Sequence, residues 1–183
     1  DFIFWSAISS HIHGEGEYVN IQNGYDLIKK IKIPKNTILV TGGLQATADP
    51  KLMLDLMPFI NIIIRGESEL VLSNLLGKFS NKQNIYDEDG IAYLENNDVI
   101  STKRQKLIND LDILSPYDYS LFDKQVFIRP YNGTLVKAID YELSRGCIYS
   151  CSTRVHEVLS SRSTCILDQP DHMWCRLKRI HPC

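Results

Sequence analysis

Cys147 and Cys151 are the residues of this sequence whose type and spacing best suit chemistry. They stand in the segment Ser-Arg-Gly-Cys-Ile-Tyr-Ser-Cys, directly after the strand-like stretch 136–143, and no cysteine precedes them in the chain. Thiolates on one short loop can converge on a metal ion or an iron–sulfur cluster. The spacing therefore predicts a strand that runs into a metal-binding or cluster-binding loop.

Composition narrows the class of protein. The 183 residues are 44% hydrophobic with a net charge of -2, and the charged residues are interspersed. This pattern indicates a globular chain with no evident nucleic-acid partner. No apolar run reaches the roughly 20 residues of a membrane span, and Asp1 opens directly into an apolar run without a basic leader. With five cysteines, an odd number confined to one end, we expect a cytoplasmic protein with free thiols and no membrane contact.

The first eighty residues alternate between strand and helix patterns. Apolar runs predict strands near residues 2–8, 37–40 and 59–64, and helical spacing predicts helices from residues 24, 50 and 68. Asp49 and Ser68 are the expected helix caps, with Pro50 at a first helical position. Strands that are apolar on both faces predict a parallel sheet covered by helices on both sides. The expected fold is α/β, a Rossmann-like doubly wound parallel sheet.

Beyond residue 80 the pattern changes. Residues 91–94 and 99–102 flank Asn96-Asn97-Asp98 as a small hairpin, and a connector then leads to strand signals at 126–129 and 135–143. The first strand of a second domain would deliver the chain to Cys147. We expect four segments: a sheet domain over 1–80, a linker over 81–134, the start of a second domain over 135–152, and a tail over 153–183.

Gly42 and Gly43 follow a predicted strand. A backbone without side chains can pass close to a flat ligand, although a tight strand-to-helix turn explains the same pair. Glu67 opens the third helix, where the free N–H groups favour a carboxylate. Capping alone explains Glu67, and contact with a ligand is the second interpretation.

An ordered series of motifs resembles radical S-adenosylmethionine enzymes that carry an N-terminal cobalamin-binding domain. The match covers residues 1 to about 152 and consists of Gly42 to Pro50, Ile64 to Glu69, Gly90 to Tyr93, Leu111-Asp112 with Pro116 to Asp118, and Ser144 to Cys151. The resemblance implies a cobalamin-binding sheet domain followed by the first strand of a radical enzyme barrel. It implies cobalamin, a 4Fe-4S cluster and S-adenosylmethionine as small-molecule cofactors of the parent enzyme, whose chemistry would resemble methyl transfer or ring formation.

The resemblance also assigns roles to residues. The glycine pair would lie beside the nucleotide tail of cobalamin, together with small hydroxyl residues after the preceding strand. The expected cofactor-binding residues are Ser6, Ser9, Ser10, Gly42, Gly43 and Glu67. Cys147 and Cys151 fit the first two positions of the Cys-x-x-x-Cys-x-x-Cys cluster motif. The third position is Arg154, which has no lone pair to offer a metal.

Residues 153–183 lose both the motif and the periodicity. Cys165 and Cys175 are too far along the chain to replace the third ligand by spacing. We therefore expect a truncated fragment that is inactive alone, with no catalytic residues assigned, and a tail that is foreign or disordered. A zinc site among the cysteines and histidines of the tail is the competing interpretation, although no Cys-x-x-Cys pair occurs there.

Two further interpretations stay open. Residues 11–17, His-Ile-His-Gly-Glu-Gly-Glu, favour a solvated loop over a metal site because no second ligand cluster lies nearby in the sequence. The alternative function is a stand-alone flavodoxin-like module that binds a ligand or a partner without catalysis. Corrin absorbance that stays with the protein would favour the cobalamin-binding enzyme fragment. Bound flavin would favour the flavodoxin-like module.

Overall fold

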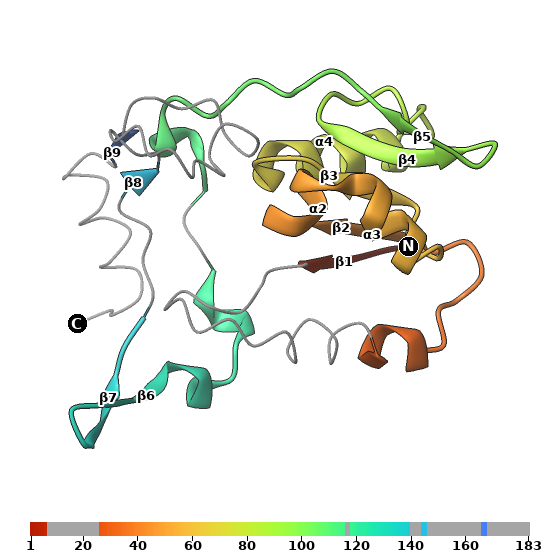
Figure 1. Ribbon diagram of the computed structural model, residues 1–183. Coiled ribbons are helices and arrows are strands. Elements are labelled where there is room, and N and C mark those ends of the chain that lie inside the picture. Colours follow the sequence, from red (N-terminus) through yellow and green to blue (C-terminus); the bar gives the residue numbers. More distant parts are fainter. Residues whose placement is uncertain (7–25, 116–117, 140–143, 146–165, 168–183) are drawn as a thin grey trace, which may run out of the picture. The chain divides into compact units, whose positions relative to one another are not determined.

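The computed structural model describes residues 1–6, 26–115, 118–139, 144–145 and 166–167 (Figure 1). These residues form two compact parts. Asp1–Leu107 belongs to the first part, and the described residues from Ile108 onward belong to the second. Each part is described by itself.

The first part is built on a five-stranded sheet in the order β1-β2-β3-β4-β5. Its strands are β1 (Phe2–Ser6), β2 (Ile38–Gly42), β3 (Ile62–Ile64), β4 (Ile91–Glu95) and β5 (Asp98–Ser101). The first three strands are parallel, which confirms the predicted α/β class. The sheet is mixed and not wholly parallel, because β4 pairs antiparallel with β3 and β5 antiparallel with β4.

The predicted hairpin over residues 91–102 is therefore present, and it extends the sheet. Asn96 and Asn97 both have positive φ, at 50° and 71°, as a tight hairpin turn requires. We expected these strands in a linker outside the sheet domain. Ile63 pairs with Ala92 and Ile64 with Ile91, so strand pairing carries the sheet past residue 80.

In the described residues, the strands are connected by the helices α2 (Leu44–Ala48), α3 (Pro50–Leu56) and α4 (Ser68–Ser80). Residues 26–30 are also helical. Asp49 caps α3 as predicted, because its side chain accepts a hydrogen bond from the Leu52 N–H at 2.9 Å and Pro50 follows at the first helical position. The cap of α4 is Glu67 and not Ser68; Ser68 is the first helical residue.

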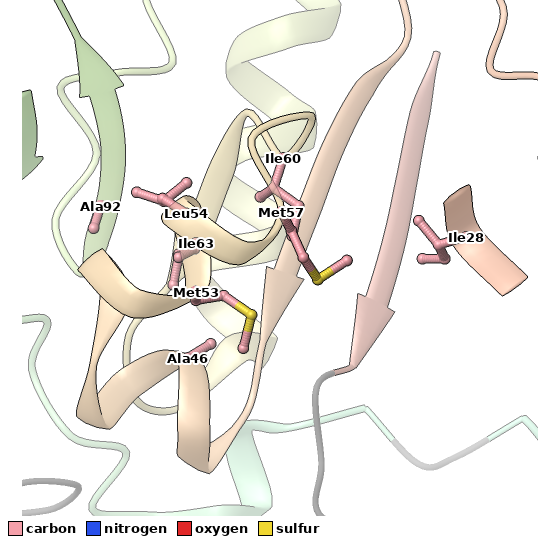
Figure 2. Close-up of a cluster of buried hydrophobic side chains, with 8 residues drawn as sticks. All are labelled: Ile28, Ala46, Met53, Leu54, Met57, Ile60, Ile63 and Ala92. Carbon is pink, nitrogen blue, oxygen red and sulfur yellow. The ribbon is translucent and has the colours of Figure 1, made fainter. Parts of the chain in front are cut away.

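The core lies on both faces of the sheet. On one face Ile63 packs with residues of α2, of α3 and of the turn after it, and Figure 2 shows this cluster: Ile28, Ala46, Met53, Leu54, Met57, Ile60, Ile63 and Ala92. On the other face Ile62 and Ile64 pack against Val71 and Leu75 of α4. Because side chains alternate along a strand, the continuous apolar run of β3 serves both faces. Figure 1 shows α4 and the pair α2 and α3 on opposite sides of the sheet.

The two outer strands of the described sheet differ in character. β5 is short, begins with Asp98 and is followed by a Thr-Lys-Arg run at residues 102–104. β1 reads Phe-Ile-Phe-Trp-Ser, and Phe2 packs edge-on against Phe79 of α4 with ring centroids 4.7 Å apart. Charged residues protect the edge of a sheet from pairing with other strands. Of the two strands, β5 carries a charged residue and β1 carries none.

A polar cluster joins α4 to the loop that precedes β4. Lys78 contacts Asp87 at 2.6 Å and Glu88 at 2.9 Å, and Asn74 donates to Glu88 at 2.8 Å. The hydrogen bond to Asp87, followed by that to Glu88, raises the pKa of Lys78 above its ordinary value. The Glu88 side chain is only 11% exposed, so Lys78 and Asn74 compensate a largely buried carboxylate.

The second part contains short elements: η1 (Leu111–Ile113), η2 (Tyr119–Leu121), η3 (Lys124–Phe127), β6 (Ile128–Tyr131), β7 (Thr134–Lys137), β8 (Ser144–Arg145) and β9 (Ile166–Leu167). An aspartate caps each 3-10 helix through a backbone N–H two residues on. The bonds from Ser120 lower the pKa of one of them, Asp118. β6 and β7 form an antiparallel hairpin around Asn132-Gly133, both with positive φ.

The second domain was expected to begin with a barrel strand at residue 135. In the described residues, β7 covers only the start of that stretch and pairs with β6, and β8 pairs antiparallel with β9. The barrel and the segment boundaries expected after residues 134 and 152 therefore stay predictions.

Candidate functional site

The three parallel strands end at the same edge of the sheet, which we call the carboxyl edge. β1 ends at Ser6, which pairs in register with Gly42 at the end of β2. β3 ends at Ile64 and is followed by Arg65 and Gly66. Ligands of open α/β sheets bind beside this edge. The structure thus brings the strand that ends at Ser6 next to the predicted glycine pair.

The two glycines of the pair have different roles. A Cβ built on Gly42 would lie 3.4 Å from the Ile64 carbonyl oxygen and 3.7 Å from the Phe4 ring, so this glycine fits between neighbouring strands. Gly43 has φ 115° and ψ 179°, a conformation that essentially only glycine adopts. Gly43 also caps α2, and its carbonyl accepts a hydrogen bond from the Thr47 N–H at 3.0 Å. The turn after β2 therefore needs glycine at position 43.

Thr47 connects this turn to the next loop of the carboxyl edge. Its hydroxyl oxygen accepts a hydrogen bond from the Gly66 N–H at 3.0 Å, and its side chain is nearly buried. Gly66 directly precedes Glu67. The predicted residues Gly43 and Glu67 therefore belong to adjacent loops that Thr47 holds together.

Glu67 occupies the position that caps α4, but its side chain makes no capping hydrogen bond. Its backbone carbonyl accepts a hydrogen bond from the Gln105 side chain. The half-buried carboxylate thus stands at the start of a 13-residue helix, where the free N–H groups favour negative charge. Its assignment as a cofactor-binding residue stays a prediction.

The remaining predicted site residues fall outside the part of the chain that the structure describes. These are Ser9, Ser10, Cys147 and Cys151, and the same holds for the residues 11–17 cluster, for Arg154, and for Cys165 and Cys175. Within the described residues, no group of three His, Cys, Asp or Glu side chains is arranged to hold a metal ion. None of the helices in that part has the length and apolar character that a membrane span requires.

Sequence reasoning missed three residues that shape the carboxyl edge: Thr47, Thr102 and Gln105. Thr47 stands five residues after Gly42, and its position within the first motif was the only available signal. The Thr102 hydroxyl bonds to both backbone groups of Ile91, at 2.9 Å and 3.1 Å. Gln105 reaches Glu67 across 38 residues. Contacts of that separation depend on the sheet register, which no local pattern encodes.

No family profile matches the sequence. Among curated proteins, the chain is similar to the anaerobic magnesium-protoporphyrin IX monomethyl ester cyclase of Cereibacter sphaeroides, with 30% identity over 156 residues that cover 83% of this chain and 24% of the relative. It is also similar to the cobalamin-dependent radical SAM methyltransferase TokK of Streptomyces tokunonensis, with 27% identity over 64% of this chain and 17% of the relative. The chain spans about a quarter of the length of the relatives that it matches.

The fold has a counterpart among solved structures. The radical S-adenosylmethionine methyltransferase TsrM from Kitasatospora setae, solved with cobalamin and a 4Fe-4S cluster bound, superposes with a TM-score of 0.59 at 15% identity. That match covers 98% of this chain and 35% of TsrM. At this identity the match supports the fold alone. The curated relatives, among them a cobalamin-dependent radical SAM methyltransferase, confirm the recognition from the motifs.

The glycine turn and the cysteine motif meet the needs of cobalamin and of a 4Fe-4S cluster to different degrees. The turn at Gly42 and Gly43 presents backbone without side chains at the carboxyl edge, which suits close approach of a flat ligand or its tail. The cluster motif supplies two thiolates, Cys147 and Cys151, with Arg154 in the third position. A guanidinium cannot ligate iron. The turn is compatible with a ligand that approaches the backbone closely, whereas the spacing places Arg154 where the motif expects a third thiolate.

Proposed function

We propose that the sheet-bearing part of this chain binds cobalamin along its carboxyl edge. The observation that carries the proposal is the Gly43 turn, whose backbone conformation excludes a side chain where β2 ends beside Ser6. The sequence similarity to a cobalamin-dependent methyltransferase supports the same assignment. Ser6, Ser9, Ser10, Gly42 and Gly43 would line the nucleotide tail, and Glu67 would contact the ligand from the next loop.

The proposal extends to the class of enzyme. In the parent enzyme, cobalamin and a radical S-adenosylmethionine centre would together supply methyl-group or carbon-centred radical chemistry. We propose that this enzyme is cytoplasmic. In this chain, Cys147 and Cys151 would provide two cluster thiolates. Because the third ligand position holds Arg154, no radical step is assigned to the chain, and we propose that it is inactive alone.

Cobalamin binding can be tested directly. The full chain is mixed with aquacobalamin, passed through gel filtration and examined for corrin absorbance that elutes with the protein. We expect stoichiometric retention for the wild type and weaker retention for Ser6→Ala, which removes the hydroxyl of the β1 residue that pairs in register with Gly42. Ser101→Ala on β5 is the matched control and should retain the ligand as the wild type does.

The same experiment discriminates the alternative function. A parallel sample receives flavin mononucleotide in place of aquacobalamin, and its absorbance is followed in the same fractions. Retained flavin without retained corrin would replace the proposed function by a flavodoxin-like module. Retention of neither ligand by a folded sample would contradict the assignment of the carboxyl edge as a cofactor site.

A further inference from the structure

The side chain of Gln105 lies across two glycines at the carboxyl edge. A Cβ built on Gly66 would lie 3.0 Å from the Gln105 Nε2, and a Cβ built on Gly90 would lie 3.0 Å from the Gln105 Cβ. Both glycines have positive φ, at 96° and 83°. The glutamine therefore fills the space that these two positions leave open, and its packing requires that neither carries a side chain.

Gln105 also makes a directed polar contact. Its Nε2 donates a hydrogen bond to the Glu67 carbonyl oxygen. That carbonyl belongs to the residue that caps α4, where the chain turns from β3 into the helix. A side chain 38 residues away thus fixes the backbone of the loop between β3 and α4.

Further hydrogen bonds connect residues 102–105, which we call the Gln105 segment, to the loop between β3 and α4. The Arg65 N–H donates to the Gly90 carbonyl at 2.7 Å, and the Gly90 N–H donates to the Lys103 carbonyl at 2.7 Å. The Arg65 Nη1 contacts the Thr102 carbonyl at 3.3 Å. These bonds and the Gln105 contact therefore connect the Gln105 segment to the loop between β3 and α4.

We propose that Gln105 is a positioning residue, which holds the β3–α4 loop in the shape that receives the cofactor before the cofactor binds. The inference rests on the proposed function, because it assumes that Glu67 and its loop contact cobalamin. A loop that is already ordered loses less conformational entropy on binding, so the affinity is higher. Gln105 itself need not touch the ligand.

Two substitutions separate this role from simple space filling. Gln105→Met keeps the length of the side chain and fills the space above Gly66 and Gly90, but it cannot donate a hydrogen bond. Gln105→Glu keeps the shape and places a carboxylate against the Glu67 carbonyl oxygen. Once protonated near its ordinary pKa of about 4.3, the new carboxyl group can donate again. If position 105 acts as a hydrogen-bond donor, acid should restore the wild-type behaviour of Gln105→Glu. If it only fills space, acid should make no difference.

The test uses the full chain. Hydrogen exchange of the backbone at residues 65–69 is measured without ligand, and aquacobalamin is titrated at about pH 7.5 and about pH 3.5, with the wild type at each pH as reference; the lower value lies well below the ordinary glutamate pKa of about 4.3. A hydrogen bond of about 1 kcal/mol corresponds to a factor of about five. We expect Gln105→Met to exchange faster and bind about fivefold more weakly at both values. Gln105→Glu should do so only at the higher pH.

Gln83 offers a matched control, since it is an exposed glutamine in the same part of the chain. Gln83→Met and Gln83→Glu should match the wild type in both measurements. Wild-type exchange at residues 65–69 in Gln105→Met, or equal behaviour of Gln105→Glu at the two pH values, would overturn the positioning role. If the wild type binds no aquacobalamin, the proposed function fails, and the exchange measurement still decides whether Gln105 orders the loop.

Discussion

The Thr47 hydroxyl and the Gly66 N–H are 3.0 Å apart, joining the helix that follows β2 to the loop that follows β3. This single contact holds together the two loops that carry Gly43 and Glu67. The Thr47 hydroxyl therefore contributes both to the stability of the fold and to the shape of the carboxyl edge. The site and the fold can therefore be tested with the same variants.

Thr47→Val should destabilise the chain by about 1–3 kcal/mol, because valine has a similar shape but leaves the Gly66 N–H without its acceptor. Thr47→Ser keeps the oxygen and should lose markedly less. Urea unfolding followed by circular dichroism measures both. Equal stability of Thr47→Val and Thr47→Ser would show that the hydrogen bond contributes nothing.

Gly43→Ala should destabilise by about 1–3 kcal/mol, since φ 115° with ψ 179° is unfavourable for any residue with a Cβ. Gly77→Ala is the opposite case. Gly77 lies inside α4, where a Cβ would meet no atom within 4 Å, so alanine should stabilise the helix by about 0.5–1 kcal/mol. Thermal unfolding of the pair measures both signs, and a stabilising Gly43→Ala would refute the account of the turn.

Ile63→Ala should cost about 2–5 kcal/mol, because it empties space in the cluster between the sheet and α3. Leu76→Ala, at a position that is 42% exposed on α4, should cost less than about 1 kcal/mol. Chemical denaturation of the two variants compares a core and a surface residue. Similar losses would mean that β3 does not carry the core.

The Lys78 cluster predicts a pH dependence. The folded-state pKa is raised, so the contribution of the cluster is complete below the ordinary pKa of 10.5 and is lost as the pH rises through the higher folded value. Lys78→Met should therefore be less stable than the wild type near neutral pH, by less than about 1 kcal/mol at this partly exposed site. The difference should disappear in strong alkali.

The exposed Lys51 provides the control for that series. Lys51→Met should follow the wild type at every pH. The variants and the wild type contain the same tyrosines. The titration of the tyrosines at high pH therefore cancels when each variant is compared with the wild type. A stability difference for Lys78→Met that persists unchanged above the raised pKa would contradict the role of the ion pairs.

The sequence predicted those parts of the fold that depend on neighbours along the chain. Asp49 and Pro50 start a helix by their own chemistry, and the apolar run 62–64 indicates a strand covered on both faces. Asn96 and Asn97 specify a turn. That the resulting hairpin joins β3 was not predictable, because the pairing of Ile64 with Ile91 is set by the packing of whole elements.

The candidate site also contains residues that a local sequence pattern predicts and residues that depend on contacts distant in the sequence. Gly42 and Gly43 were found because a backbone turn leaves a local signature, whereas Thr47 and Gln105 act on residues 19 and 38 positions away. Glu67 and not Ser68 occupies the cap position of α4, because two adjacent polar residues can both start a helix and the sequence does not distinguish them. Cys147 and Cys151 lie outside the described residues, so their assignment stays a prediction.

The uncharged sequence of β1 has a practical consequence for the purification of this chain. Of the two outer strands of the described sheet, β1 offers an apolar ribbon with Phe4 38% exposed and no charge within Phe2–Ser6. Such a ribbon templates the addition of foreign strands. Concentrated samples should therefore self-associate through β1, and dilute handling or a lysine in place of Phe4 should delay precipitation.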